Sequence, residues 1–182
     1  MRVLVFLADG FEEVEALTVV DYLRRVEIKV DLVSITNSRH VFGAHGIEVR
    51  TDKTLRVVDE NDYVGLVIPG GMPGATNLRD CPEVIDLVTT MNKKKKLIAA
   101  ICAGPIVLAK ANLIEGRKIT SYPGFESQLL GSTYVENPVV RDDNFITARG
   151  PFFAVDFVLE IVDYLLGDKE VSKLKEDLLY ID

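Results

Sequence analysis

Cys102 stands where a buried strand is expected to turn sharply into a helix. It follows the apolar run 97–101 and precedes Ala103-Gly104-Pro105, whose small residues tolerate a tight turn. Such a turn, a nucleophile elbow, presents its side chain at the carboxyl edge of a sheet. The free N–H groups at the start of the next helix favour a thiolate over a thiol. The pattern predicts a reactive cysteine; the alternative is a cysteine used as a small core hydrophobe.

Glu15 is the second candidate, because apolar residues surround it in the sequence. Val14, Ala16 and Leu17 flank it, so burial should desolvate its carboxyl group and raise its pKa. A protonated carboxyl at this edge could donate a hydrogen bond to the Cys102 thiolate or shuttle a proton for it. The alternative is a surface glutamate in the first turn of a helix, where acidic residues are favoured anyway.

A glycine pair, Gly70-Gly71, follows the expected strand 64–68. Glycines directly after a strand let backbone N–H groups approach a ligand or line an oxyanion site. The lysine and hydroxyl of a phosphate-binding loop are absent, so a nucleotide site is not indicated. A tight turn without further function is the alternative.

Histidine is scarce. His40 and His45 both precede Cys102, in a segment with a hairpin pattern, so a Cys–His dyad in the usual order is unavailable. One of the two could still approach Cys102 from an earlier loop or from a second subunit. A metal site needs more ligands than these at usable spacing, and we predict no metal and no cofactor. Tyr122 is a candidate polar partner, although an aromatic residue before a proline more often packs.

The composition indicates a globular protein. Hydrophobic residues make up 48% of the 182-residue chain, which argues against disorder. A chain of this length buries roughly 70% of its unfolded surface, so one domain over residues 1–182 needs no disulfide staple. The two cysteines indicate no disulfide framework, and no run approaches the ~20 apolar residues of a membrane helix. We therefore expect a cytoplasmic protein without membrane contact.

The formal charge of −7 argues against nucleic acid as a partner. The one basic run, Lys93–Lys96, falls where a helix should end, and cations there complement the helix dipole. The helix expected at Glu12–Val26 carries more apolar surface than one sheet face can cover. We expect it to form a homodimer interface, with the last long helix buried within the chain.

Short apolar runs alternate with helical patterns along the chain, which predicts an α/β fold with a mostly parallel sheet covered on both faces. Ligands on such sheets bind at the carboxyl ends of the strands. Strands are expected at 3–7, 30–35, 64–68, 97–101 and 145–147, with weaker signals at 47–50, 118–120 and 139–141 and a hairpin turn at 142–144. Helices are expected at 12–26, 82–92, 104–111, 152–166 and 171–178.

Three segments in this order resemble the ThiJ/PfpI superfamily: 9–15 (DGFEEVE), 69–71 (PGG) and 99–105 (AAICAGP). The likeness is closest to the subfamily of the parkinsonism-associated protein deglycase, and it extends to the segment 149–151 (RGP). The resemblance implies a single flavodoxin-like α/β/α sandwich of three layers over 1–182, of the class I glutamine amidotransferase type. It also implies a homodimer with the first helix near the interface.

The resemblance implies roles for the candidate residues as well. Cys102 matches the family's oxidation-prone nucleophile and Glu15 its protonated glutamate, while backbone amides of Gly70, Gly71 and Ala103 would surround the thiolate. In the family such sites are linked to glyoxalase or deglycase chemistry on 2-oxoaldehydes such as methylglyoxal. They are also linked to cysteine sulfinate formation under oxidative stress.

This sequence departs from the family pattern near the site. Tyr122 stands where the subfamily often has a histidine, and Phe152-Phe153 replaces a small Gly-Thr pair, which is expected to narrow the site. The protease branch has histidine directly after the cysteine, where this chain has Ala103. Tyr122, His45 and Arg149 are the further side chains expected to contact substrate or the catalytic pair.

Three hypotheses follow, the first being a glyoxalase- or deglycase-type enzyme in which Cys102 is the nucleophile and Glu15 moves protons. The second is a redox-responsive, chaperone-like dimer that uses oxidation of Cys102 to sulfinate and has little catalysis. A scaffolding protein with a vestigial site is the third. An intracellular cysteine peptidase is the least favoured enzyme.

Overall fold

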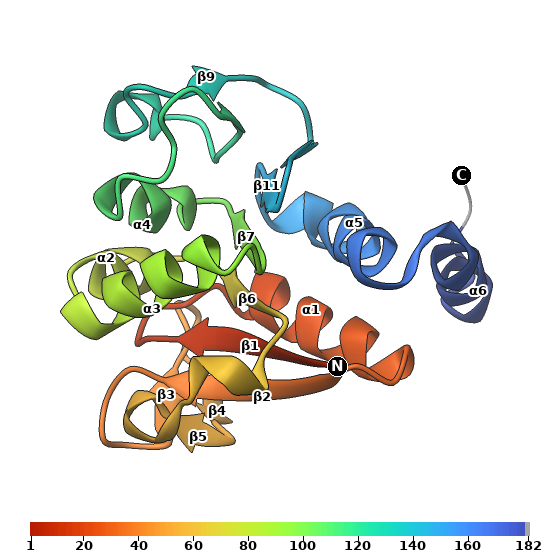
Figure 1. The fold of residues 1–182 in the computed structure, drawn as a ribbon. Helices are drawn as coiled ribbons and strands as arrows, with labels where there is room; N and C mark the ends of the chain where they lie inside the picture. The colour runs from red at the N-terminus through yellow and green to blue at the C-terminus, as the bar shows by residue number, and fades with distance from the viewer. Residues whose placement is uncertain (181–182) are drawn as a thin grey trace.

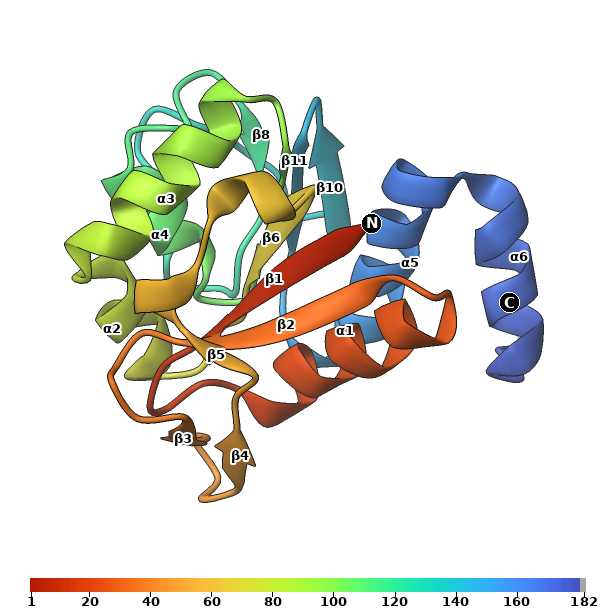
Figure 2. The ribbon, with the colours of Figure 1, turned by 60° about the horizontal axis from the view of Figure 1, so that its bottom comes forward.

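The computed structural model describes residues 1–180 of the chain and places helices on both faces of a central sheet (Figures 1 and 2). The strands are β1 (Arg2–Leu7), β2 (Lys29–Ser34), β3 (His40–Phe42), β4 (Glu48–Arg50), β5 (Lys53–Thr54), β6 (Gly65–Ile68), β7 (Leu97–Ile101), β8 (Lys118–Ile119), β9 (Thr133–Tyr134), β10 (Val139–Asp142) and β11 (Phe145–Ala148). The α-helices are α1 (Glu13–Arg25), α2 (Gly74–Arg79), α3 (Pro82–Lys93), α4 (Pro105–Lys110), α5 (Ala154–Leu166) and α6 (Asp168–Asp177).

Seven strands form the main sheet, in the order β10-β11-β7-β6-β1-β2-β5. All neighbours pair in parallel except β10 and β11, which form an antiparallel hairpin. The chain continues from β1 to one side through β2 and returns on the other side through β6. Strand order therefore reverses at β1 and β6, where open sheets of this kind bind ligands. The carboxyl ends of β1, β6, β7 and β11 share one edge.

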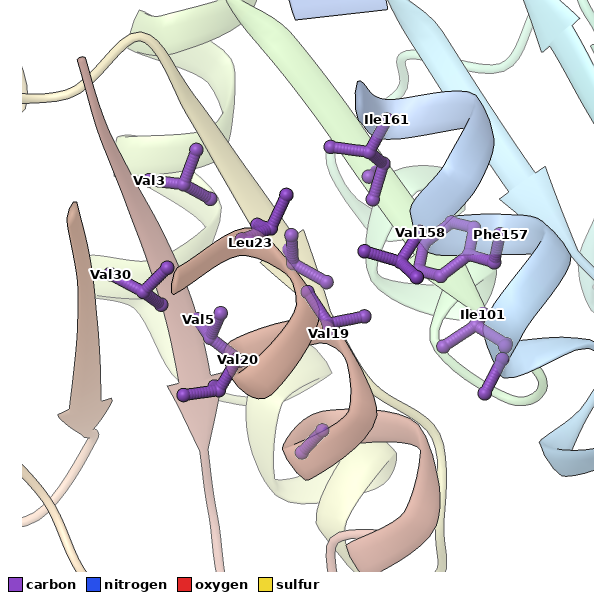
Figure 3. Close-up of a cluster of buried hydrophobic side chains, with 14 of the residues drawn as sticks. Val3, Val5, Val19, Val20, Leu23, Val30, Ile101, Phe157, Val158 and Ile161 are labelled. Carbon is purple, nitrogen blue, oxygen red and sulfur yellow. The ribbon is translucent and has the colours of Figure 1, made fainter. Parts of the chain in front are cut away.

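Each face of the sheet packs against its own layer of buried hydrophobic side chains. Val3 and Val5 of β1 pack toward α1 and α5, whereas Leu4 and Phe6 pack toward α2, α3 and α4. Figure 3 shows the first layer, in which α1 and α5 bring side chains over β1 and β7. Strands buried on both faces explain why the strand segments are almost continuously apolar. The predicted sandwich of three layers with a mostly parallel sheet is confirmed.

Most elements lie within a few residues of the expected bounds, and the differences have local causes. Helix α2 was not expected, because only Gly74, Ala75 and Leu78 of its six residues are buried and no helical period is visible. The segment 151–153 forms a 3₁₀ turn, so that α5 begins at Ala154 and not at 152. Helix α6 begins at Asp168, before its first apolar residue.

Among residues 1–180, no helix combines the length and the apolar character that a membrane crossing requires.

A cluster of charged side chains holds the opposite, amino-terminal edge of the sheet together. The Asp31 carboxylate in β2 accepts two hydrogen bonds from Arg2 (2.7 and 2.8 Å) and one from the Tyr63 hydroxyl (2.8 Å). Lys53 lies 2.9 Å from the same carboxylate. Burial raises the pKa of Asp31, but the hydrogen bonds from these three side chains outweigh it and hold the pKa below its ordinary value. The ionised carboxylate thus joins β1, β2 and β5.

We expect Asp31→Asn to lower the free energy of unfolding by about 3 kcal/mol, because it leaves two cations without a counter-charge in a largely buried place. Urea unfolding at pH 7 measures the loss. Asp21→Asn is the control, since the Asp21–Arg25 pair is about half exposed and should leave the midpoint almost unchanged. Equal midpoints for the two variants would show that the Asp31 cluster does not stabilise the sheet.

Candidate functional site

Cys102 occupies a strained turn directly after β7. Its φ angle is +62°, in the left-handed region that residues with a side chain seldom adopt. Two backbone hydrogen bonds hold the residue there: its N–H donates to the Ala148 carbonyl and its carbonyl accepts from the Tyr122 N–H, both at 2.9 Å. The backbone has the nucleophile elbow expected from the sequence, and the half-buried thiol lies at the carboxyl edge of the sheet.

Glu15 lies in the first turn of α1 and is completely buried. Its Oε2 accepts a hydrogen bond of 2.7 Å from the Gly70 N–H, whereas its Oε1 is buried without a hydrogen-bond partner in the described chain. The carboxyl and the Cys102 thiol are hydrogen-bonding neighbours. A buried carboxyl with one unsatisfied oxygen is arranged to keep a proton on that oxygen.

Gly70 lets the sulfur and the acid meet. A Cβ at this position would lie 2.6 Å from the Cys102 Cβ, 2.9 Å from its Sγ and 2.7 Å from Glu15 Oε2. Any other residue would separate the pair. The expectation that the Gly70 amide lines an oxyanion site needs correction, because this N–H donates to Glu15. The Gly71 and Ala103 N–H groups are the ones that donate toward the Cys102 sulfur.

The electrostatics of the pair differ from those expected for an independently acidic thiol. Burial raises the pKa of Cys102 to about 12, with the neighbouring Glu15 charge adding to the effect and the Gly71 and Ala103 amides opposing it. Burial also raises the pKa of Glu15 to about 7. Helix α4 has only six residues, so its dipole does not offset the burial of the thiol. Between these two values the pair holds one proton, and the thiolate forms when Glu15 takes it.

The other three expected side chains lie at different distances from the pair. Tyr122 is half exposed, and its backbone contacts Cys102 directly. Arg149 follows Ala148 and directs its guanidinium to the Glu136 carbonyl at 3.2 Å. His45 is engaged elsewhere, since its N–H and its Nδ1 each lie 2.8 Å from an oxygen of the Glu13 carboxylate.

Glu12, Glu13 and His45 gather at the start of α1, with ligand atoms within 4.8 Å of one another. The spacing of the two histidines in the sequence gives no sign of this group, because the β3–β4 hairpin brings His45 to these acids only in the folded chain. Both Glu13 oxygens already bond His45, so hydrogen bonding accounts for the geometry. We assign no metal to this group.

A cavity of about 270 Å³ was missed by the sequence argument. Tyr122 and Pro123 form one wall, and the segment Arg149–Phe153 forms the other. The Phe152-Phe153 pair was expected to narrow the site, but here it borders an open hollow. The signal available in the sequence was this unusual aromatic pair directly after the segment 149–151.

The family model described as DJ-1/PfpI matches residues 1–164. The chain belongs to the DJ-1/PfpI family. Among curated DJ-1/PfpI relatives, protein dj-1beta of Drosophila melanogaster is 37% identical over 178 residues, covering 97% of this chain and 95% of that protein. A Parkinson disease protein 7 homolog of Danio rerio is 34% identical over 185 residues, covering 100% of this chain and 98% of that one.

Solved DJ-1 structures have the same fold. Drosophila melanogaster DJ-1beta superposes with a TM-score of 0.95 at 36% identity, over 100% of this chain and 98% of that one. Oxidized Toxoplasma gondii DJ-1 gives a TM-score of 0.94 at 36% identity, over 100% and 99%. The flavodoxin-like fold expected from the resemblance is confirmed.

Glu15 should make stability depend on pH. Its pKa rises from 4.5 to about 7 on folding, so its stabilising contribution is complete below pH 4.5 and is lost as pH rises through 7. The loss is on the order of 3 kcal/mol. We expect Glu15→Gln to gain that much stability relative to wild type between pH 4.5 and 8, as measured by urea unfolding.

Glu176→Gln, at an exposed position of α6, is the control and should follow the wild-type pH dependence. A constant difference between Glu15→Gln and wild type across this range would show that Glu15 is already ionised at low pH.

Proposed function

We propose that the protein is a glyoxalase- or deglycase-type enzyme acting on small 2-oxoaldehydes such as methylglyoxal. One observation carries this proposal: the Cys102 thiol lies beside the buried Glu15 carboxyl and the Gly71 and Ala103 amides, at the carboxyl edge of the sheet where such folds bind ligands. A nucleophile next to a group that can both accept and return a proton is what rearrangement of a 2-oxoaldehyde needs.

The first step is addition of the thiol to the aldehyde. Glu15 takes the thiol proton, and the sulfur attacks the aldehyde carbon to form a C–S bond. The carbonyl electron pair moves to oxygen, where the Gly71 and Ala103 N–H groups can donate to the developing negative charge. Glu15 gives the thiol proton to that oxygen, which produces a hemithioacetal on Cys102 and leaves Glu15 as a carboxylate.

The second step moves hydrogen between the two carbons. The Glu15 carboxylate removes the proton from the former aldehyde carbon and returns it to the neighbouring ketone carbon, while the hydroxyl proton passes from the former aldehyde oxygen to the former ketone oxygen. The product is a thioester of a 2-hydroxy acid, and no outside oxidant is needed because one carbon is oxidised as the other is reduced. Water then hydrolyses the thioester, releasing lactate when the substrate is methylglyoxal.

We expect wild-type protein to convert methylglyoxal to lactate, and Cys102→Ser and Glu15→Gln each to lose at least about 100-fold in kcat/KM. Enzymatic lactate determination measures the product. Cys81→Ser is the control, because Cys81 lies before α3 and bonds Glu83, away from the pair. Equal rates in all four proteins would remove the proposal.

Oxidation of Cys102 is the second candidate function, and the similarity to oxidized Toxoplasma gondii DJ-1 favours it. The same Gly71 and Ala103 amides can donate to the oxygens of a sulfinate, and a protonated Glu15 can bond it as well. In this function the dimer responds to oxidant and turns over little substrate.

Mild hydrogen peroxide should add two oxygen atoms to Cys102, which peptide mass spectrometry would locate. Glu15→Gln should lower the yield of this adduct several-fold, because it removes the group that accepts the thiol proton. Oxidation that begins at Cys81, or that leaves Cys102 unmodified, would contradict a redox role.

A second copy of the chain is the proposed protein partner, through α1. Val14 of α1 is half exposed, as are Phe42 and Ile47 of the adjoining β3–β4 hairpin, so that helix and hairpin present apolar side chains to the outside. Helix α5, by contrast, packs into the core beside α1. We further propose a cytoplasmic location, where a reducing environment would keep both free cysteines as thiols.

A further inference from the structure

The cavity of about 270 Å³ near Cys102 has an unusual lining. Its walls carry three aromatic rings and two prolines, with Arg149 as the single charged residue: Tyr122, Pro123, Arg149, Pro151, Phe152 and Phe153. Cavities that bind small molecules typically combine apolar walls with a few polar groups of this kind.

Backbone hydrogen bonds attach both walls to the nucleophile. The Tyr122 N–H donates to the Cys102 carbonyl, and the Cys102 N–H donates to the carbonyl of Ala148, the residue before Arg149. Gly150 keeps the walls close, since a Cβ there would lie 3.1 Å from the Tyr122 ring. The walls of the cavity are therefore joined to the turn that carries Cys102, at the same carboxyl edge of the sheet.

The aromatic wall faces outward and is not covered by any part of the described residues 1–180. Phe152 is 88% exposed and meets Phe153 edge to face, with ring centroids 5.3 Å apart. Tyr122, across the cavity, is half exposed as well. Large apolar side chains held open in this way lose contact with water when a flat apolar group enters between them.

Arg149 adds a positive charge to the apolar walls. Its Nη1 donates to the Glu136 carbonyl and lies 4.0 Å from the exposed Glu136 carboxylate, but a guanidinium has five N–H donors and a planar face, so other donors stay available to a ligand. Such a group attracts an aromatic face by a cation–π interaction and attracts a carboxylate by charge. A plain alkyl chain would gain neither interaction.

We propose that this cavity is the subsite for the side group of the substrate and that it selects an aromatic group, so that the preferred substrates are aryl 2-oxoaldehydes. The products are then aryl 2-hydroxy acids. This assignment rests on the proposed function for the reaction itself, but the binding of the aromatic group can be measured without turnover.

The kinetic test compares phenylglyoxal with methylglyoxal. In wild type, kcat/KM for phenylglyoxal should exceed that for methylglyoxal by at least about tenfold, a typical effect of an apolar subsite. Phe152→Ala should lower this ratio about tenfold. Val57→Ala removes another exposed apolar side chain, near β5 at the far edge of the sheet, and should keep the wild-type ratio.

The binding test uses mandelate and lactate, the hydroxy acids that correspond to the two substrates, with NMR titration of the protein. Mandelate should bind at least about tenfold more tightly than lactate, and Phe152→Ala should remove the difference. Tighter mandelate binding without turnover of either aldehyde would support the subsite while removing the glyoxalase proposal. Turnover of methylglyoxal without any preference for phenylglyoxal or mandelate would overturn the subsite alone.

The other candidate for covering Phe152 is a second copy of the chain. Sedimentation velocity distinguishes a subunit interface at Phe152 from a substrate subsite. Wild type and Phe152→Ala should have the same molar mass. A smaller mass for Phe152→Ala, together with no preference for mandelate, would assign Phe152 to a subunit interface and overturn the proposal.

Discussion

A single proton held between a sulfur and a buried carboxyl is the interaction on which the site depends. Burial opposes a negative charge on Cys102 and on Glu15, because it removes the charged form of each group from water. As pH rises through neutrality the pair loses its first proton from Glu15, whereas burial keeps the proton on the Cys102 thiol and outweighs the opposing Gly71 and Ala103 amides. The reactive form of the thiol is therefore a property of the pair and not of the cysteine or of a helix dipole.

Holding Cys102 and Glu15 in these positions lowers the stability of the fold. The positive φ angle of Cys102 and the unsatisfied oxygen of Glu15 are both unfavourable, and each persists because its surroundings are rigid. That rigidity comes from the two apolar layers and from the Asp31 cluster, which lies at the other end of the strands. Separating the stabilising cluster from the strained site allows each to be changed with little direct effect on the other.

The cavity wall beside the Cys102 turn carries both of the departures from the family pattern that the sequence shows, at Tyr122 and at Phe152-Phe153. A tyrosine in place of a common histidine removes a base and adds an aromatic surface, and Phe152 adds a second one. Because Glu15 already accepts and returns protons, the proposed chemistry does not require a histidine. In the proposed reaction the two departures act in the same direction, since one carboxyl carries the acid–base chemistry and aromatic contact selects the substrate.

The local pattern of apolar and polar residues in the sequence determined much of the secondary structure. Apolar runs and their spacing were enough to predict the parallel strands β1, β2, β6, β7 and β11, the larger helices and the position of Cys102 after β7, because burial on both faces of a parallel sheet leaves a continuous signal. The apolar neighbours of Glu15 likewise predicted its burial. Short elements such as α2 escaped, since six residues with three buried positions have no measurable period.

Tertiary structure alone decided the direction of individual atoms. The Gly70 N–H serves Glu15 and not an oxyanion, His45 pairs with Glu13, and Phe152 borders a cavity, all through contacts between segments far apart in sequence. The pKa of Cys102 also depends on such contacts, because its burial and the Glu15 charge come from segments that are near in space but far apart in the sequence. A sequence specifies which groups are present at the sheet edge, whereas only the packed chain sets which of them share a proton.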